Sequence, residues 1–191
     1  MHSRSDMLKT RQIELTGRDD DVKLTLQELP ALAADRIARK LIDRWRGDKT
    51  GGVVGLALRH QAALRKLGEG SLPALMPFVN IVTGAPKGLD SLKDWQNVGR
   101  VQQAALALHA DFLIGRESLE LPIAMQAEGI LAGEGLAATF CSPFIAAVIQ
   151  SGMATYVELE TILSTEDAFN LAELLNVDAV RHWRDAQKRK G

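Results

Sequence analysis

The chain has 191 residues, enough to bury a hydrophobic core of its own as one large domain or as one domain with a smaller appendage. Its 23 Lys and Arg residues nearly balance its 24 Asp and Glu residues, so the net charge of -1 offers no general attraction to nucleic acid or to an anionic membrane surface. Cys141 is the only cysteine, which excludes an internal disulfide and a thiolate metal cluster.

The sequence predicts a cytoplasmic protein without a membrane span. The first ten residues are polar and lack the apolar run of a secretory signal. Residues 135–157 carry no charge and are long enough to cross a bilayer, but Pro143, Gly152 and several hydroxyl side chains interrupt them. No excess of Lys or Arg flanks this stretch to orient a span. We therefore expect buried helices that are joined near Ser142 and Pro143.

A β-hairpin is predicted near the N-terminus. Residues 11–16 and residues 22–27 alternate apolar and polar side chains, and residues 17–21 between them have the composition of a turn. One side of this hairpin is apolar and must be covered by a helix or by another copy of the hairpin, because an isolated hairpin is marginal in water. The pattern also leaves an exposed strand edge.

An amphipathic helix follows the hairpin and is the clearest element of the sequence. Apolar side chains recur at offsets of three and four from Ala34 to Trp45, and charged side chains, Asp35 among them, occupy the other positions. Pro30 suits the first helical turn, and Gly47 suits the end of the helix.

The middle of the chain predicts more helix. Residues 52–68 have a one-sided helical pattern, whereas residues 71–86 contain three prolines and predict a short helix with a buried connection. A longer helix should begin near Asp90 or Ser91, either of which can cap it, and end near Gly115. Its apolar stripe consists of Trp95, Val98, Val101, Ala105, Leu108 and Phe112.

The C-terminal third begins with a change of composition near residue 119. Ala, Gly, Ile, Leu and Met dominate from there, until Ser164 and Asp167 form the pattern of a capping box. Two short helices, broken near residues 176–178, should follow. We predict an α+β fold, mainly helical, with an N-terminal β-hairpin and a helical C-terminal appendage. Residues 1–118 would form the hairpin plus helical domain and residues 119–191 the C-terminal region.

No group of residues has the spacing of a metal or cofactor site. The four histidines, His2, His60, His109 and His182, are scattered, and we expect His60 and His109 to lie at the edge of a core. The glycines of residues 129–136 are not followed by Lys-Ser or Lys-Thr, which excludes a phosphate-binding loop.

Catalytic groups are not apparent either. Residues 19–21, Asp-Asp-Asp, lack the downstream Glu of a calcium loop and predict a solvated turn. Cys141 is expected to be a small buried residue. Carboxylate pairs such as Glu117 with Glu120 lie in ordinary helix-surface contexts. We therefore expect no cofactor, no metal and no enzyme activity.

Two segments resemble a known family. Residues 13–41, with Leu29, Pro30 and Ala31 at the junction of hairpin and helix, resemble the start of tail assembly chaperones of long-tailed bacteriophages. Residues 163–190, with an acidic cap and a Leu-Leu pair, resemble the terminal helices of small phage tail proteins. Together these segments cover roughly a third of the chain.

The resemblance implies a non-catalytic chaperone in the cytoplasm of a bacterial host. It would bind the tape measure protein and tail tube subunits during tail morphogenesis and would self-associate, with the hairpin edge as one possible contact. A structural tail component, such as a completion or connector subunit, is an alternative, and a small enzyme is a more distant one. Phe169, Leu175 and Trp183 are candidates for the partner-binding surface, although local packing explains their spacing as well.

Overall fold

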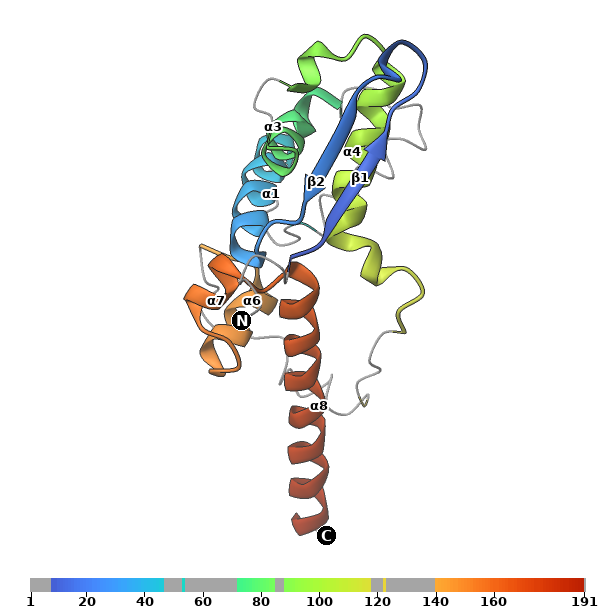
Figure 1. Ribbon diagram of the computed structural model, residues 1–191. Helices are drawn as coiled ribbons and strands as arrows, with labels where there is room; N and C mark the ends of the chain where they lie inside the picture. Colours follow the sequence, from blue (N-terminus) through green and yellow to red (C-terminus); the bar gives the residue numbers. More distant parts are fainter. Residues whose placement is uncertain are drawn as a thin grey trace, which may run out of the picture.

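The computed structural model describes residues 8–46, 53, 72–84, 88–117, 122 and 140–190 of the chain. The predicted fold class is confirmed, because a two-stranded hairpin stands against a mainly helical body (Figure 1). The elements are β1 (Thr10–Glu14), β2 (Lys23–Gln27), α1 (Ala31–Arg46), α3 (Leu72–Val82), α4 (Trp95–Ala110), α6 (Pro143–Gln150), α7 (Tyr156–Thr161) and α8 (Thr165–Lys190). Short 3-10 turns occur at Gly17–Asp19, Gly88–Ser91 and Asp111–Leu113.

The hairpin has the alternation that its sequence predicts. Strands β1 and β2 are antiparallel, and Ile13 lies opposite Leu24. Ile13, Leu24 and Leu26 pack against a core, whereas the other face of both strands carries only exposed polar side chains. One face of the hairpin is therefore covered by helices and the other is in water.

Helix α1 begins and ends where the sequence predicts. Its apolar stripe is buried at Ala34, Ala38 and Leu41. Asp35, which the sequence places off the apolar stripe, is nevertheless only 2% exposed. It accepts hydrogen bonds from the backbone N–H of Ser142, at 2.9 Å, and from the Ser142 hydroxyl. A charge on this helix thus anchors the start of α6.

The described residues form two hydrophobic cores. The first lies beneath the hairpin, between α1, α3 and α4, and includes the fully buried Phe78 and Val79 of α3. The second joins α6, α7 and α8. Ala31 and Leu32, in the first turn of α1, belong to the second core, although the rest of α1 packs in the first. Helix α1 therefore links the two layers across the boundary predicted at residue 118.

Helices α3 and α4 differ from the sequence prediction at their ends. Helix α3 is 11 residues long and continues past Pro77. Burial of Phe78 and Val79 offsets the loss of the backbone hydrogen bond that the proline cannot make. Helix α4 is capped by Asp94, whose side chain accepts from the backbone N–H of Gln96 at 3.0 Å, and not by Asp90 or Ser91. Trp95, placed on the apolar stripe by its spacing, is 71% exposed in the first turn of α4.

The hairpin turn is anchored and not fully solvated. Asp20 and Asp21 are exposed, but Asp19 is only 1% exposed. Its carboxylate accepts hydrogen bonds from the backbone N–H of Lys93 at 2.8 Å, from that of Asp94 at 3.0 Å and from the Asn97 amide at 2.9 Å. The turn is therefore tied to the start of α4.

Helix α8 is continuous where the sequence predicts a break. The capping box is confirmed, because the Ser164 hydroxyl accepts from the N–H of Asp167 and the Asp167 carboxylate accepts from the N–H of Ser164. The helix then runs for 26 residues without a break at residues 176–178, which contain neither Gly nor Pro. Its C-terminal half extends away from the other elements (Figure 1).

Other sequence predictions lie outside the described residues. These are the helix at residues 52–68, apart from the buried Val53, and the glycine-rich residues 129–136. In the ranges that the structure does describe, none of the helices has the length and apolar content needed to cross a membrane.

Candidate partner-binding groove

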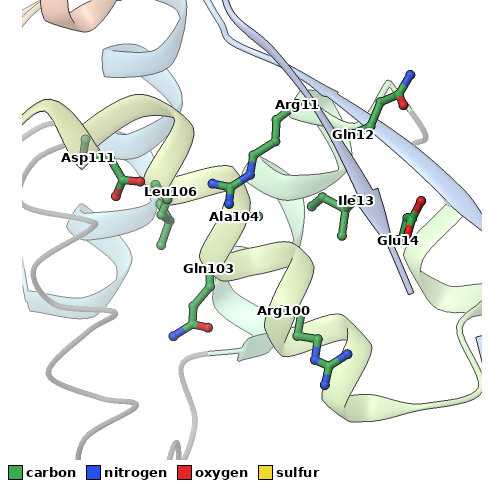
Figure 2. A pocket seen from close by; sticks show the side chains of 11 residues that line it. Arg11, Gln12, Ile13, Glu14, Arg100, Gln103, Ala104, Leu106 and Asp111 are labelled. Carbon is green, nitrogen blue, oxygen red and sulfur yellow. The ribbon is translucent and has the colours of Figure 1, made fainter. Parts of the chain in front are cut away.

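A groove of about 540 Å³ runs between strand β1 and helix α4 (Figure 2). Four consecutive residues of β1, from Arg11 to Glu14, line one side of it. The side chains of Arg11 and Ile13 point toward α4, whereas those of Gln12 and Glu14 lie on the other face of the strand (Figure 2). Because residues of both faces line the groove, it lies along the free edge of β1.

Along this edge, backbone N–H and C=O groups have no hydrogen-bond partner among the described residues. The N–H of Glu28 donates to the carbonyl of Lys9 at 2.8 Å, so residues 9 and 28 form a hydrogen-bonded pair next to the ladder. Such pairs alternate along antiparallel strands, so Arg11 and Ile13 direct their backbone groups toward β2. Thr10, Gln12 and Glu14 therefore direct their N–H and C=O groups toward the free edge of β1, and Gln12 and Glu14 line the groove.

Helix α4 forms the floor of the groove. Arg100, Ala104, Ala107 and Asp111 follow one another at intervals of three and four residues and thus share one side of the helix. Ala104 and Ala107, in the middle, have the shortest of these side chains, so the centre of the floor is low and apolar. The two ends of the floor have opposite charges.

Hydrogen bonds hold the strand and the helix at this spacing. The Arg100 guanidinium donates to the Thr16 hydroxyl at 2.6 Å, and the Asn97 amide donates to the Thr16 carbonyl at 2.8 Å. Both bonds lie just beyond the end of β1, so strand and helix run antiparallel, with the charged Asp111 near the start of β1. Within the described residues, the side chains of Arg11, Glu14 and Asp111 make neither hydrogen bonds nor ion pairs.

The buried histidine predicted at a core edge has a structural role. His109 is fully buried, and its Nδ1 lies 2.8 Å from the carbonyl of Ala105, to which it donates. Its Nε2 accepts from the backbone N–H of Leu29 at 2.9 Å. Burial lowers the pKa of His109 to about 4, so the ring is neutral at pH 7.

The buried acids lie apart from the groove. Burial raises the pKa of Asp35, which accepts hydrogen bonds from Ser142 at the start of α6. Burial also raises the pKa of the neighbouring Cys141 thiol to about 11, and the Asp35 charge adds to this effect. Cys141 is buried, as predicted. Burial also raises the pKa of Glu28, whose Oε2 accepts from the N–H of Lys9 at 3.1 Å and whose Oε1 has no hydrogen-bond partner.

Metal-binding side chains are scattered over the described part of the chain. Among the residues that the structure describes, three or more His, Cys, Asp or Glu side chains do not gather in any place that could hold a metal ion. Among the histidines and carboxylates that the sequence analysis considered for metal binding or catalysis, Glu117 and His182 are exposed. His2, His60 and Glu120 lie outside the described residues.

The three residues that the sequence suggests for partner binding lie on α8. Phe169 is partly buried in an aromatic cluster, with its ring centroid 5.5 Å from that of Phe112 and 5.8 Å from that of Phe144. Leu175 packs on the second core, and Trp183 is partly buried further along the helix. Local packing thus accounts for Phe169 and Leu175, and no contact with a partner is needed to explain them.

A second surface has exposed apolar side chains. Phe140, just before α6, lies beside Tyr156, at the start of α7, with ring centroids 6.3 Å apart. Both side chains are about half exposed, and Val157 and Met153 beside them in the chain are also exposed. Such clusters of exposed apolar residues often contact other proteins.

Comparison with known proteins adds no further constraint, since no family model, no curated protein and no solved structure matches this chain. The residues of the groove were not identified from the sequence. The alternating pattern of residues 11–16 did indicate an unpaired strand edge, but nothing in the sequence shows which helix lies beside that edge.

Proposed function

We propose that this protein binds other polypeptides during the assembly of a phage tail, as a non-catalytic chaperone of the tape measure protein and of tail tube subunits. The resemblance of residues 13–41 and 163–190 to phage tail assembly proteins suggests this role. The observation that carries the proposal is the groove, whose wall is the edge of β1 to which no other described strand pairs. Backbone groups of this kind pair with other backbones and therefore suit a polypeptide ligand.

The groove suits the reversible binding that a chaperone needs. Its floor is apolar in the middle, at Ala104 and Ala107, and charged at both ends, at Arg100 and Asp111. A bound segment would gain backbone hydrogen bonds and bury little apolar surface, so each site would bind weakly. Several copies that act together on one long tape measure protein would bind it firmly, and the complex could still be released.

Self-association is part of the proposal. The exposed cluster of Phe140, Tyr156 and Val157 is distant from the groove in the chain and lies next in sequence to residues of the second core, such as Cys141 and Leu159. We assign contacts between copies to this cluster, so that the groove stays open for a partner. Light scattering after gel filtration should show oligomers for the wild type and a smaller species for Val157→Glu. An unchanged mass for Val157→Glu would contradict this assignment.

Co-expression with the tape measure protein tests the function. The wild-type chain should retain the tape measure protein on an affinity column and keep it in the soluble fraction. Ala107→Arg, which fills the floor of the groove, should reduce this retention, whereas Ala147→Arg on the exposed side of α6 should not. A chaperone that leaves before the virion is finished should also be absent from purified virions. Mass spectrometry that finds the protein in virions would favour a structural tail component.

A further inference from the structure

The edge of β1 is the most specific recognition feature of the described residues. The described residues include two strands, in the order β1-β2, and none of these residues pairs with the outer edge of β1 along the groove. The direction of the backbone groups alternates along β1, as the Lys9–Glu28 hydrogen bond requires. The backbone groups that point away from β2 are those of Thr10, Gln12 and Glu14. An extended segment along this edge would meet three N–H donors and three C=O acceptors at the spacing of a strand, those of Gln12 and Glu14 inside the groove.

A twofold pairing of β1 with β1 of a second copy is unfavourable at this edge. Neighbouring strands lie about 5 Å apart, and α4 runs below the free edge of β1. A twofold pairing of β1 with β1 of another copy would therefore bring two α4 helices within about 5 Å, whereas packed helices need about 8–10 Å between their axes. The occupant must be a strand that brings no helix beneath it. The hairpin edge is for this reason a poor contact for self-association.

The charges along the edge select the sequence of the occupant. The Arg11 side chain points toward the groove and the Glu14 side chain lies on the outer face, and neither has an ionic partner within the described residues. Residues directly opposite each other on neighbouring strands interact, and opposite charges are favourable there. Ile13, with Ala104 and Ala107 below, leaves room for one aliphatic side chain between these charges.

We propose that the groove binds an extended segment of a partner polypeptide as a third strand, antiparallel to β1, with the order basic, aliphatic, polar and acidic from its N-terminus. The basic residue faces Glu14, the aliphatic residue faces Ile13, the polar residue faces Gln12 and the acidic residue faces Arg11. This inference rests on the proposed role in polypeptide binding, and it adds the mode of binding and the charge pattern of the partner.

The proposal predicts which backbone groups of the ligand matter. In antiparallel pairing, the ligand residue opposite Gln12 exchanges two backbone hydrogen bonds with it, because the Gln12 groups point into the groove. The ligand residue opposite Ile13 directs its N–H away from β1. A methyl group on the first of these nitrogens blocks binding, and a methyl group on the second leaves binding intact. Other binding modes do not produce this alternation.

The experiment uses the full chain, labelled with nitrogen-15, and three capped peptides of sequence T-K-V-T-E-T. One peptide is unmodified, one is N-methylated at its central threonine, opposite Gln12, and one at its valine, opposite Ile13. The unmodified peptide should shift the amide signals of Gln12 and Glu14 with a dissociation constant on the order of a millimolar. Methylation at threonine should weaken binding about tenfold or more, and methylation at valine less than about threefold.

Variants of the protein add a second test. Ala107→Arg should abolish binding of the unmodified peptide, whereas the matched Ala147→Arg should bind as the wild type does, and thermal unfolding will show that both are folded. Arg11→Glu should weaken binding, and Arg18→Glu, in the exposed hairpin turn, should not. Absence of binding to the wild type, equal affinities for both methylated peptides, or signal shifts confined to other elements would each overturn the proposal.

The outcomes separate this inference from the proposed function. If the peptides bind as described and the tape measure protein is not retained on the column, the groove is a strand-binding site for another polypeptide. If the tape measure protein is retained and the methylated peptides show no alternation, the chaperone role stands and the strand-addition mode is wrong.

Discussion

His109 on α4 accepts a hydrogen bond from the backbone N–H of Leu29 at 2.9 Å. Leu29 precedes Pro30 at the point where the hairpin passes into α1, and the bond spans 80 residues of sequence. The accepting nitrogen must be unprotonated, since the other ring nitrogen donates to the carbonyl of Ala105. One neutral imidazole thus fixes the junction of the hairpin, α1 and α4, and the groove lies between the hairpin and α4.

This arrangement predicts a loss of stability in acid. The pKa of His109 falls from 6.5 in the unfolded chain to about 4 in the folded protein because of burial. Its contribution is therefore complete above pH 6.5, decreases as the pH falls toward 4, and amounts to about 3 kcal/mol of unfolding free energy. Urea unfolding between pH 4 and pH 8 should show this decrease in the wild type and in His182→Gln, an exposed control. The decrease should be smaller in His109→Gln, and identical curves for His109→Gln and the wild type would contradict it.

Glu28 predicts the opposite dependence on pH. Burial raises its pKa above the ordinary value of 4.5, so the folded state binds the proton more tightly than the unfolded state does. Its contribution to stability is therefore greatest below pH 4.5 and is lost as the pH rises through the folded pKa. The unfolding free energy of Glu28→Gln minus that of the wild type should therefore be larger at pH 8 than at pH 4. Glu14→Gln, on the exposed face of β1, is the control, and the reverse trend in Glu28→Gln would exclude this interpretation.

Asp19 should be essential for anchoring the hairpin turn. In Asp19→Asn one carboxylate oxygen becomes an NH₂ group, which faces N–H donors of Lys93, Asp94 or Asn97. The loss of charge-assisted bonds should lower the melting temperature by roughly 5 °C. The neighbouring Asp20→Asn, in an exposed position, should change it by less than about 1 °C. Calorimetry measures both, and equal melting temperatures would show that the anchor contributes nothing.

Phe169 should stabilise the fold whatever its role in partner binding. Its ring contacts Phe112 and Phe144, and the Arg116 guanidinium lies 5.1 Å from its centroid. Phe169→Ala should therefore reduce the free energy of unfolding by roughly 2–3 kcal/mol, because it opens a cavity in this cluster. Leu174→Ala, at a half-exposed position of the same helix, should cost less than about 1 kcal/mol. Chemical denaturation compares the two, and similar values would show that the aromatic cluster adds little.

Local patterns were sufficient to predict most of the elements. The alternation in residues 11–16 and 22–27 predicted the hairpin, and the apolar spacing from Ala34 onward predicted α1 with its ends. The Ser164–Asp167 capping box predicted the start of α8. These features depend on residues a few positions apart, where backbone geometry relates sequence spacing directly to a face of a helix or a strand.

Spacing was less informative at the ends of elements. A cap at Asp90, Ser91 or Asp94 satisfies the same local rule, and the choice of Asp94 coincides with the Asp19 contacts to Lys93 and Asp94. The break expected at residues 176–178 did not occur, because weak helix formers alone do not end a helix that is already formed.

The sequence alone therefore determined the secondary-structure elements and their apolar faces. It predicted a half-apolar hairpin, amphipathic helices and an unpaired strand edge. Only the tertiary structure decided that Asp19, Asp35 and His109 are buried anchors, and that α4 lies beneath the edge of β1 to form a groove. The partners in these contacts are 74 to 107 residues apart in the chain. A polar side chain can be buried only where a distant segment supplies its hydrogen-bond partner, and spacing along the chain contains no record of that partner.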